Sequence, residues 1–408
     1  MPEAVIVSVA RSPIGRANKG SLTQLRPDDL AATIVKTALD KIPALDPHTV
    51  DDLYLGCGLP GGESGNNMAR VVNVLNGMDG VPGATTTRYC ASSVQTTRMA
   101  FHAIKASEGD VFISAGVETV SRFAKGTSDH WPDTHNHAFD DAKARTTATA
   151  EGDGSTTPDW HDPREDGQVP DVYIAMGQTA ENVAKLRGLS RQELDEFAVR
   201  SQNLAEKAVN DGFWAREITP VTTPDGTVVS VDDGPRAGVT YDGIKDLKPV
   251  FRPDGVVTAG NCCALNDGAA AVVIMSDTKA AELGLTPLAR IVSTGVSGLS
   301  PEIMGLGPVE ATKNALRYAG MSIGDIDLVE INEAFAAQVV PSYQDLGIDI
   351  DRLNVNGGAI AVGHPFGMTG ARLQNTMVNS LDWHDKSTGL ITMCVGGGQG
   401  MALILERL

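Results

Sequence analysis

Apolar residues recur along the first third of the chain with two different spacings. Short continuous apolar runs predict buried strands, and apolar residues that return every three or four positions predict an amphipathic helix. In chain order, these elements are the strand Ala4–Val9, the helix Pro27–Asp40, the strand Asp52–Cys57, the segment Ala84–Tyr89 leading into a helix from about Ala91 to Lys105, and the strand Val111–Val117. Strands that alternate with helices indicate βαβ units and a mainly parallel sheet.

The pattern changes between Ser121 and Pro170, where the chain is polar and rich in Pro, Gly and Asp. Long segments without periodicity are uncommon in compact domains unless they form lids or binding loops, so we expect irregular structure here. A strongly helical stretch, Gly177–Asn210, follows. Within it, Ser190 with Glu193 three residues later is a capping-box pattern that predicts a second helix start.

After Gly255 the alternation of strands and helices returns. The predicted elements are the strands Ala269–Met275, Leu288–Val296 and Leu328–Ile331, the helix Pro308–Ala319, and a closing hairpin of Leu390–Val395 and Met401–Glu406. A chain of 408 residues is too long for one ordinary core. We therefore predict an N-terminal α/β half over residues 1–120, a loop domain over 121–255, and a similar C-terminal half over 256–408. Residues 256–280 could instead supply a strand to the N-terminal half.

Charge and cysteine content narrow the class of protein. The chain has 33 Lys and Arg against 51 Asp and Glu, a net charge of −18, which argues against nucleic acid or an anionic membrane surface as a partner. No stretch approaches the ~20 apolar residues of a membrane span, so we expect no membrane insertion. Five cysteines without a CxxC pair predict free thiols in a reducing compartment, and hence a cytoplasmic protein.

Two segments place a reactive side chain where a strand meets a helix. Cys90 stands just before the helix that starts near Ala91, where the helix dipole favours a thiolate and free N–H groups can hold an oxyanion. Asn332 and Glu333 end an apolar strand, and strand ends of this kind bind ligands in α/β sheets. Each has a structural alternative, with Cys90 as a small buried hydrophobe and Asn332 as a helix cap.

Two glycine-rich segments carry the other candidates. Asn356–Gly370 contains five glycines and fixes His364 on a rigid turn before a proline, which favours a functional imidazole. Met393–Gly400 places Cys394 ahead of three successive glycines. A nucleotide-binding glycine loop does not fit the second segment, because only eight residues follow it and no crossover helix can form.

The combination of these segments resembles the thiolase family. The motifs Asn-Glu-Ala-Phe-Ala at 332–336, Gly-His-Pro-x-Gly-x-Thr-Gly at 363–370 and Cys-x-Gly-Gly-Gly-x-Gly at 394–400 occur in the family's order and spacing. Further segments that match along the chain are 10–15, 176–182, 258–261, 266–268 and 304–308. The resemblance implies a layered α/β fold of two similar βαβαβαββ halves, with the insert as a loop domain over the active site.

The resemblance also implies a role for each candidate residue. Cys90 is expected to be the acylated nucleophile and Cys394 the acid and base. Asn332, through a water, and His364 would hold an enolate oxygen, and the N–H groups of Cys90 and Gly396 would hold a tetrahedral oxyanion. The residues expected near coenzyme A and the acyl chain are Met176, Lys248, Cys263, Met304 and Phe335.

The implied chemistry is acyl-CoA C-acyl transfer, that is, reversible condensation and thiolysis of 3-ketoacyl-CoA in fatty acid metabolism such as β-oxidation. Coenzyme A is then a substrate, no cofactor is bound permanently, and a homodimer or homotetramer is expected. The α-hydrogen of a thioester is a very weak acid, so its removal needs strong donors at the enolate oxygen and a base of matched pKa. We expect the site to lower a thiol pKa from its usual ~8.5 for this purpose.

Several positions differ from the common pattern of the family. Ala91 and Ser93 follow the nucleophile, Cys263 and Ala264 stand where a Ser-Gly pair is usual, and Ala175 replaces a histidine that is frequent in acetoacetyl-CoA enzymes. These departures put the pantetheine contact at Cys263 in doubt. They favour an acyl substrate other than the small acetoacetyl type and leave its chain unassigned.

Other interpretations remain at this stage. A ketoacyl synthase would share the fold but resembles a Cys-His-His site, against which Asn332 and the second cysteine argue. A non-catalytic CoA-binding or scaffold protein is opposed by the joint presence of all four candidate catalytic side chains. A metal site is weakly suggested by histidines in the polar insert, but their spacing favours a solvated lid, so no metal is expected. These histidines are His130, His135, His137 and His161.

Overall fold

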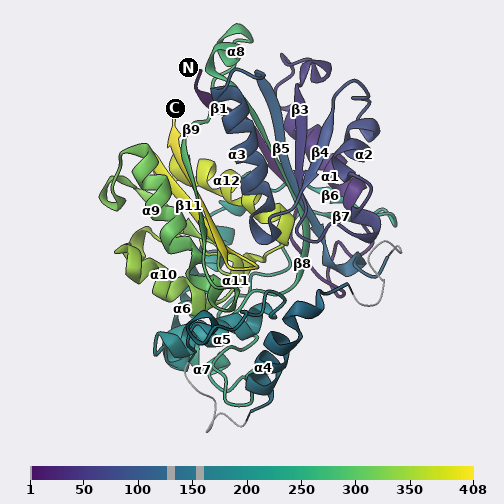
Figure 1. Cartoon of the computed structure of the whole chain (residues 1–408). Coiled ribbons are helices and arrows are strands. Elements are labelled where there is room, and N and C mark those ends of the chain that lie inside the picture. The colour runs from purple at the N-terminus through teal and green to yellow at the C-terminus, as the bar shows by residue number, and fades with distance from the viewer. Residues whose placement is uncertain (1, 126–133, 153–159) are drawn as a thin grey trace.

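A single mixed sheet runs through the chain, as a computed structural model that describes residues 2–125, 134–152 and 160–408 shows (Figure 1). The N-terminal half of the sheet contains β1 (Ala4–Arg11), β2 (Gly15–Arg16), β3 (Asp52–Gly56), β4 (Gly83–Thr86), β5 (Val111–Thr119) and β8 (Asn266–Ser276). β3 pairs in parallel with β4 and β5, whereas β8 lies antiparallel between β5 and β1. The last strand of this half is therefore supplied only after the chain has passed through the insert.

The C-terminal half of the sheet repeats this arrangement. It contains β9 (Ala289–Gly298), β10 (Leu328–Ile331), β11 (Thr388–Val395) and β12 (Gln399–Arg407). β10 and β11 are parallel, and β12 lies antiparallel between β11 and β9, as β8 does between β5 and β1. Even the place of β4 has a counterpart, because Leu353 forms a parallel bridge to Val329 of β10. The predicted fold of two similar α/β halves is confirmed. The expectation of a mainly parallel sheet is wrong, because β1, β8 and β12 each pair antiparallel with both of their neighbours.

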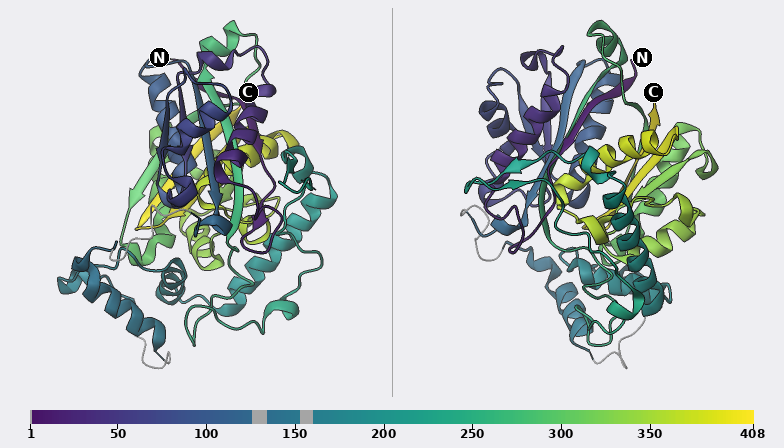
Figure 2. Two further views of the ribbon diagram at one scale, coloured as in Figure 1. Left: turned by 90° about the vertical axis from the view of Figure 1, so that its right-hand side faces the viewer. Right: turned by 180° about the vertical axis from the view of Figure 1, so that it is seen from behind.

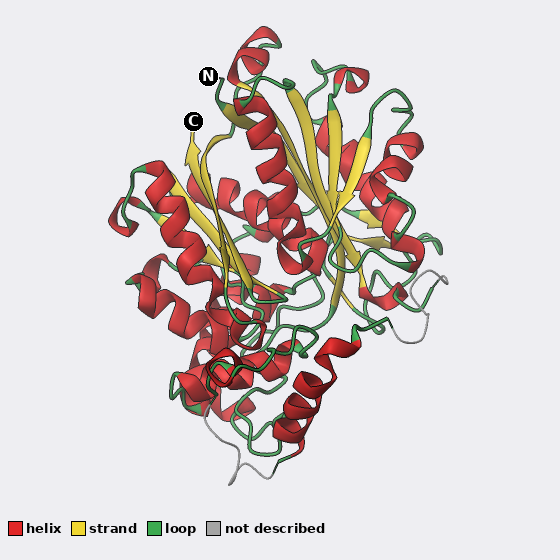
Figure 3. Ribbon diagram, in the orientation of Figure 1, coloured by secondary structure: helices red, strands yellow, loops and turns green. Residues whose placement is uncertain are grey.

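Helices cover both faces of each half and make layers (Figure 3). The two central helices, α3 (Ser92–Lys105) and α12 (Phe366–Trp383), pack against each other between the halves. The outer helices are α1 (Pro27–Asp40) and α2 (Met68–Leu75) on the N-terminal half, and α9 (Gly307–Ala319) and α10 (Ala336–Leu346) on the C-terminal half. Short helices α8 (Asp277–Glu282) and α11 (Ala359–Val362) complete the two halves.

Three buried clusters follow from these layers, one on each outer side and one between the halves. The middle cluster includes Cys90 together with apolar residues of α3 and α12. The predicted strands and helices of both halves lie at these positions to within a few residues, because continuous apolar runs such as β8 are buried along their whole length. The amino ends of α3 and α12 thus meet in the interior of the molecule.

The insert lies beside the sheet and carries its own helices (Figure 2). These are α4 (Asp140–Glu151), α5 (Met176–Leu186), α6 (Arg191–Asn210) and α7 (Tyr241–Ile244), with the small hairpin of β6 (Val221–Thr222) and β7 (Val228–Val229). The predicted capping box at Ser190 and Glu193 is confirmed at the start of α6. Among the described residues, no helix combines the length and apolarity needed to cross a bilayer.

The expectation of irregular structure throughout Ser121–Pro170 is wrong for α4. Only Ala142 of this helix is buried, so its sequence has no apolar stripe for a periodicity analysis to detect. Asp140 and Asp141 lie in its first turn, where carboxylates interact favourably with the positive end of the helix dipole. A helix with so few buried residues has the polar composition of a loop, and composition alone therefore predicts a loop.

Candidate active site

Cys90 lies on a tight turn at the amino end of α3. The turn is a short 3-10 helix, Tyr89–Ala91, and Tyr89 adopts a left-handed conformation with φ of 44°. A side chain in this region strains the backbone by about 1–2 kcal/mol, so the surrounding contacts must hold it. The hydroxyl of Ser92 does so by accepting the N–H of Arg88 at 2.9 Å and donating to the carbonyl of Tyr89 at 2.6 Å.

The second cysteine and its glycine turn meet this nucleophile candidate. Cys394 is buried near the end of β11, and the backbone N–H of Gly396 acts to lower the pKa of the Cys90 thiol. Gly398 must be glycine at this turn, since its φ is 78° and a Cβ atom there would lie 2.2 Å from the carbonyl oxygen of Leu299. Gly396 and Cys90 therefore lie close together, as expected from the sequence.

His364 is fixed at the amino end of α12. Its N–H donates to Oδ1 of Asn266 at 2.9 Å, and its Nδ1 lies 2.6 Å from Oγ1 of Thr369. The residue is buried, and Nε2 has no hydrogen-bond partner among the described protein groups. Burial, together with the charge of Arg372, lowers the pKa of His364 to about 3, so the imidazole is neutral at physiological pH.

Asn332 is a second candidate residue whose buried polar atoms have no partner among the described residues. Its backbone N–H continues the ladder of β10 by donating to Thr392 at 3.0 Å, but neither Nδ2 nor Oδ1 has a partner among the described residues. Leaving a buried polar group unpaired costs about 1–3 kcal/mol, and a ligand that pairs with it recovers this energy. The helix-cap interpretation of Asn332 does not hold, because α10 begins at Ala336 after the cap residue Phe335.

Glu333 anchors the segment that carries Asn332. Its carboxylate accepts hydrogen bonds from the hydroxyl of Ser201 at 2.6 Å, from Nδ2 of Asn354 at 2.7 Å and from the N–H of Ile360 at 3.1 Å. These contacts join α6, the region after β10 and α11 around one buried side chain. The position of Asn332 is consequently set by contacts from both the insert and the C-terminal half.

The expectation of a lowered thiol pKa is wrong for both cysteines. Burial and, to a smaller degree, the carboxylate of Glu118 raise the pKa of Cys90 to about 12, although the N–H groups of Gly396 and Cys90 act to lower it. Burial also raises the pKa of the Cys394 thiol well above its usual value. The helix dipole that the sequence suggested is outweighed by the loss of solvent, so both side chains rest as neutral thiols.

Glu118 is a residue of this region whose importance the sequence did not reveal. It is fully buried at the end of β5 and accepts the N–H groups of Gly58 at 2.7 Å, Gly367 at 2.8 Å and Leu59 at 3.2 Å. Burial raises its pKa to about 7. Because the three donors come from two distant loops, no local pattern could have indicated this convergence.

A cavity of about 240 Å³ opens beside Cys90. Its lining includes Tyr89, Cys90, Met176, Phe366, Gly396 and His135. His364 stacks edge-on against Phe366, with ring centroids 5.3 Å apart, and so stands behind this wall. The cavity thus brings together the nucleophile candidate, the Gly396 N–H group and one predicted substrate contact, Met176.

None of the other predicted coenzyme A contacts, Cys263, Met304, Phe335 and Lys248, lines the cavity beside Cys90. Cys263 donates its N–H to Ala334 at 3.0 Å and interacts electrostatically with both Cys90 and Cys394, and Phe335 packs near Phe251 with centroids 6.1 Å apart. Met304 is buried in the outer core cluster of the C-terminal half. Lys248 is exposed in the stretch after α7 and does not line the cavity beside Cys90.

The histidines of the insert do not converge. His135 stacks on Tyr173 with ring centroids 4.0 Å apart, His137 pairs with Asp140, and His161 pairs with Asp166. His130 lies outside the described residues. Within residues 2–125, 134–152 and 160–408, no three His, Cys, Asp or Glu side chains are grouped as metal ligands would be.

Comparison with known protein families covers almost the whole chain. Residues 4–278 match the family described as thiolase, N-terminal domain, and residues 285–407 match the family described as thiolase, C-terminal domain. The boundary falls after β8, which completes the first half of the sheet.

Individual proteins and structures agree with this. A 3-ketoacyl-CoA thiolase of Bacillus subtilis is 41% identical, and a 3-oxoadipyl-CoA/3-oxo-5,6-dehydrosuberyl-CoA thiolase of Escherichia coli is 42% identical, each over 100% of both chains. The crystal structure of the acetyl-CoA acetyltransferase of Bacillus anthracis matches with a TM-score of 0.85 and 37% identity over 100% of this chain and 99% of that one. The dimeric peroxisomal thiolase of Saccharomyces cerevisiae matches with a TM-score of 0.87 and 32% identity over 100% and 98%.

Proposed function

The chain belongs to the thiolase family and is an acyl-CoA C-acyltransferase, and we propose that it cleaves and forms 3-ketoacyl-CoA through an acyl group carried on Cys90. The observation that carries this proposal is the cavity that Cys90 and Gly396 line, with His364 packed against its wall residue Phe366. His364 and Asn332 are buried with polar atoms that no described protein group satisfies. Of these atoms, Nδ2 of Asn332 can donate to an oxygen of a thioester, and Nε2 of His364 can do so once it is protonated.

In the degradative direction, the sulfur of Cys90 attacks the 3-keto carbon of the substrate. The N–H groups of Cys90 and Gly396 hold the resulting oxyanion, which is the geometry that makes such donors effective. The bond between the second and third carbons then breaks, and the electron pair leaves as the enolate of acetyl-CoA. Cys394 protonates this enolate and then, as a thiolate, takes the proton of a second coenzyme A. The sulfur of that coenzyme A attacks the acyl carbonyl and displaces Cys90, which recovers its proton from His364.

His364 has a defined role in this sequence because its hydrogen bonds fix a tautomer. The hydroxyl of Thr369 donates to the carbonyl of Pro365 at 2.7 Å, so it accepts a hydrogen from Nδ1 of His364 and leaves Nε2 as an acceptor. We propose that Nε2 takes the proton of Cys90 as its sulfur attacks. The imidazolium that forms then donates to the enolate oxygen together with Asn332, through the water expected on that side chain.

A second cavity offers a route for coenzyme A. It is lined by Arg16, Arg236 and Cys262 among others, and its two arginines suit the phosphates of coenzyme A in a chain that is otherwise acidic.

The relatives are named for different acyl chains, from 3-ketoacyl-CoA in general to 3-oxoadipyl-CoA. We accordingly propose a cytoplasmic homo-oligomer that degrades 3-ketoacyl-CoA, as in β-oxidation, with coenzyme A as substrate and no resident cofactor.

The test is an assay of coenzyme A-dependent cleavage. Acetoacetyl-CoA and longer 3-ketoacyl-CoA substrates are incubated with coenzyme A, and the products are separated by chromatography. We expect acetyl-CoA and an acyl-CoA two carbons shorter than the substrate. Binding of coenzyme A without cleavage of any substrate would indicate a non-catalytic protein on this fold, and condensation without cleavage would indicate a synthase.

A further inference from the structure

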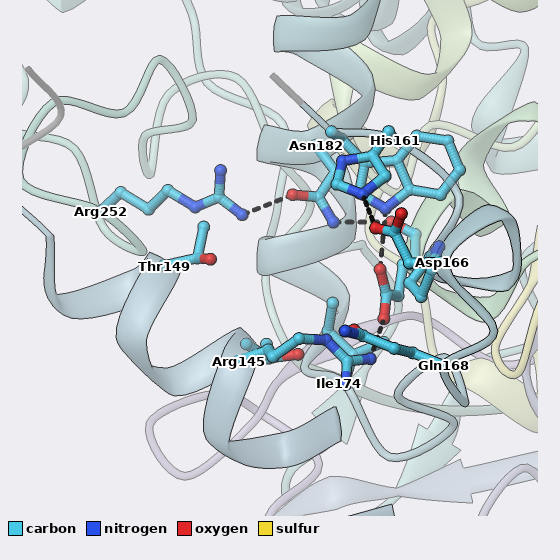
Figure 4. A pocket seen from close by; sticks show the side chains of 12 residues that line it. Arg145, Thr149, His161, Asp166, Gln168, Ile174, Asn182 and Arg252 are labelled. Carbon is cyan, nitrogen blue, oxygen red and sulfur yellow. Dashed lines mark hydrogen bonds and ion pairs between the residues drawn. The ribbon is translucent and has the colours of Figure 1, made fainter. Parts of the chain in front are cut away.

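A polar pocket of about 270 Å³ lies next to the cavity beside Cys90, and this inference rests on the proposed function of that cavity. The two spaces share Ile174, which lines both and is itself buried. The pocket is enclosed by α4, by α5 and by the stretch that contains His161 and Gln168 (Figure 4). It is therefore positioned to receive the part of an acyl chain that extends past Ile174.

Arg252 gives this pocket a buried cation. It is 7% exposed, and its Nε and Nη2 atoms donate to neutral acceptors, namely Gln178 at 2.7 Å and Asn182 at 2.6 Å. Over the described ranges of the chain, no carboxylate lies within ion-pair distance of Arg252, although Glu181 and Asp254 act to raise its pKa from farther away, and Nη1 donates to no described acceptor. A buried guanidinium is costly unless an anion pairs with it, so an anionic ligand would find a favourable site here.

Arg145 of α4 adds a second cation. Its Nη2 donates to the carbonyl of Val169 at 2.6 Å, and Thr149 lies one turn further along the same helix (Figure 4). The nearest carboxylate is Glu302, 4.0 Å away, but this group already accepts the indole N–H of Trp160 at 2.8 Å and the N–H of Asp171 at 2.9 Å. Glu302 carries one negative charge and, among the described residues, forms no ion pair with Arg252, so it cannot neutralise both arginines.

The other polar pair of the pocket lies toward solvent. His161 and Asp166 form a pair at 2.7 Å on the exposed side. Between this pair and the arginines, Ile174, Pro163 and the ring of Trp160 provide apolar surface. A ligand that suits the pocket has an apolar stem and an anionic end.

We propose that this pocket binds a carboxylate at the far end of the acyl chain, so that the preferred substrates are 3-ketoacyl-CoA thioesters of dicarboxylic acids. The 3-keto carbon lies at Cys90, the methylene stem beyond it passes Ile174, and Arg145 and Arg252 hold the terminal carboxylate. A guanidinium is well suited to this role, because its fixed N–H groups match both oxygens of a carboxylate.

The experiment compares two substrates of equal chain length, 3-ketohexanoyl-CoA with a methyl end and 3-ketoadipyl-CoA with a carboxylate end. For the wild-type enzyme, we expect a kcat/KM for cleavage about 10-fold or more in favour of the carboxylate. Arg145→Gln should lower kcat/KM for 3-ketoadipyl-CoA by about 10- to 100-fold and leave 3-ketohexanoyl-CoA within about 2-fold. Lys143→Gln is the matched control, since it removes the same charge from an exposed position of α4 outside the pocket.

The outcomes separate this inference from the proposed function. If 3-ketohexanoyl-CoA is cleaved but the carboxylate gives no advantage, or if Arg145→Gln affects both substrates equally, the pocket is not a carboxylate site. If neither substrate is cleaved by the wild-type enzyme, the proposed function itself fails. Unchanged cleavage of the methyl-ended substrate by Arg145→Gln also shows that the variant is folded.

Discussion

At the scale of single residues, the two candidate catalytic cysteines differ in the donors around them. The N–H groups of Gly396 and Cys90 both act to lower the pKa of the Cys90 thiol, whereas for Cys394 only its own N–H group does so. A site that stabilises charge on sulfur and on an adjacent oxyanion suits an acyl carrier. Because Cys394 has fewer such donors, we assign it proton transfer and not acyl transfer.

Substitution of each cysteine by alanine separates these roles. Cys90→Ala should form no acyl adduct with an acyl-CoA, whereas Cys394→Ala should still be acylated but should lose α-hydrogen exchange, with cleavage reduced by about 100- to 10,000-fold. Intact-protein mass spectrometry measures the adduct, and NMR in deuterated water measures the exchange. An adduct that persists in Cys90→Ala, or one that is lost while exchange continues in Cys394→Ala, reverses the assignment.

The raised pKa of Cys90 makes a prediction about pH. With a pKa of about 12, the free thiol is neutral at all ordinary pH values, and each unit of pH increases the thiolate fraction about tenfold. The rate of alkylation of Cys90 by iodoacetamide should rise without a plateau up to about pH 10. A plateau near the usual thiol pKa of ~8.5 would show that the site activates the free thiol after all.

Glu118→Gln provides the matched variant for this measurement. The carboxylate of Glu118 raises the pKa of Cys90, and it is charged above its own pKa of about 7. Its replacement by a neutral amide removes that repulsion, so the pKa of Cys90 should fall. Alkylation of Cys90 at about pH 9 should then be faster than in the wild-type protein, while the rates should converge below about pH 6, where Glu118 is protonated.

At the scale of helices and strands, a few side chains determine how the insert and the halves fit together. Ser201 of α6 donates to Glu333 at 2.6 Å and accepts the N–H of Gly358 at 3.1 Å, and all three residues are buried. Through Glu333 this contact sets the strand end that carries Asn332. The helix of the insert is thereby coupled to the active site of the C-terminal half.

Ser201→Ala tests this coupling. The variant leaves a buried carboxylate oxygen and a buried N–H group short of a partner, so its free energy of unfolding should fall by about 1–3 kcal/mol. Urea denaturation measures the change, and kcat should fall as well because Asn332 is less firmly held. Asn203→Ala on the exposed face of the same helix is the control and should stay within about 0.5 kcal/mol of the wild-type protein. Equal stability of both variants would contradict the proposed coupling.

This scale also shows what the sequence could and could not reveal. Strands such as β8 and the capping box of α6 follow from local patterns, and so were predictable. The helix α4 has no apolar stripe and was missed. Glu118 was missed as well, because its role depends on N–H donors from Gly58 and Gly367, which only the folded chain brings together. Burial also reversed the expected direction of the thiol pKa, since a sequence does not state how much solvent remains.

At the scale of the whole molecule, an open strand edge and two exposed apolar side chains lie together. β4 is the last strand at its end of the sheet, and the backbone groups of an edge strand can pair with another chain. α2 packs beside β4 and exposes Val74 by 50% and Leu75 by 52%. Apolar side chains gathered beside an open edge are typical of an interface.

We therefore predict that two copies of the chain associate across this edge. Size-exclusion chromatography with light scattering should give at least twice the mass of one chain for the wild-type protein. Val74→Glu combined with Leu75→Glu introduces two charges into the contact, and burying them unpaired is unfavourable, so this variant should dissociate to monomers at micromolar concentration. Tyr318→Glu, which changes a side chain 62% exposed on α9 of the other half, is the control and should remain associated. A wild-type monomer would refute the association, and a double variant that stays associated while Tyr318→Glu dissociates would move the interface to the opposite end of the sheet.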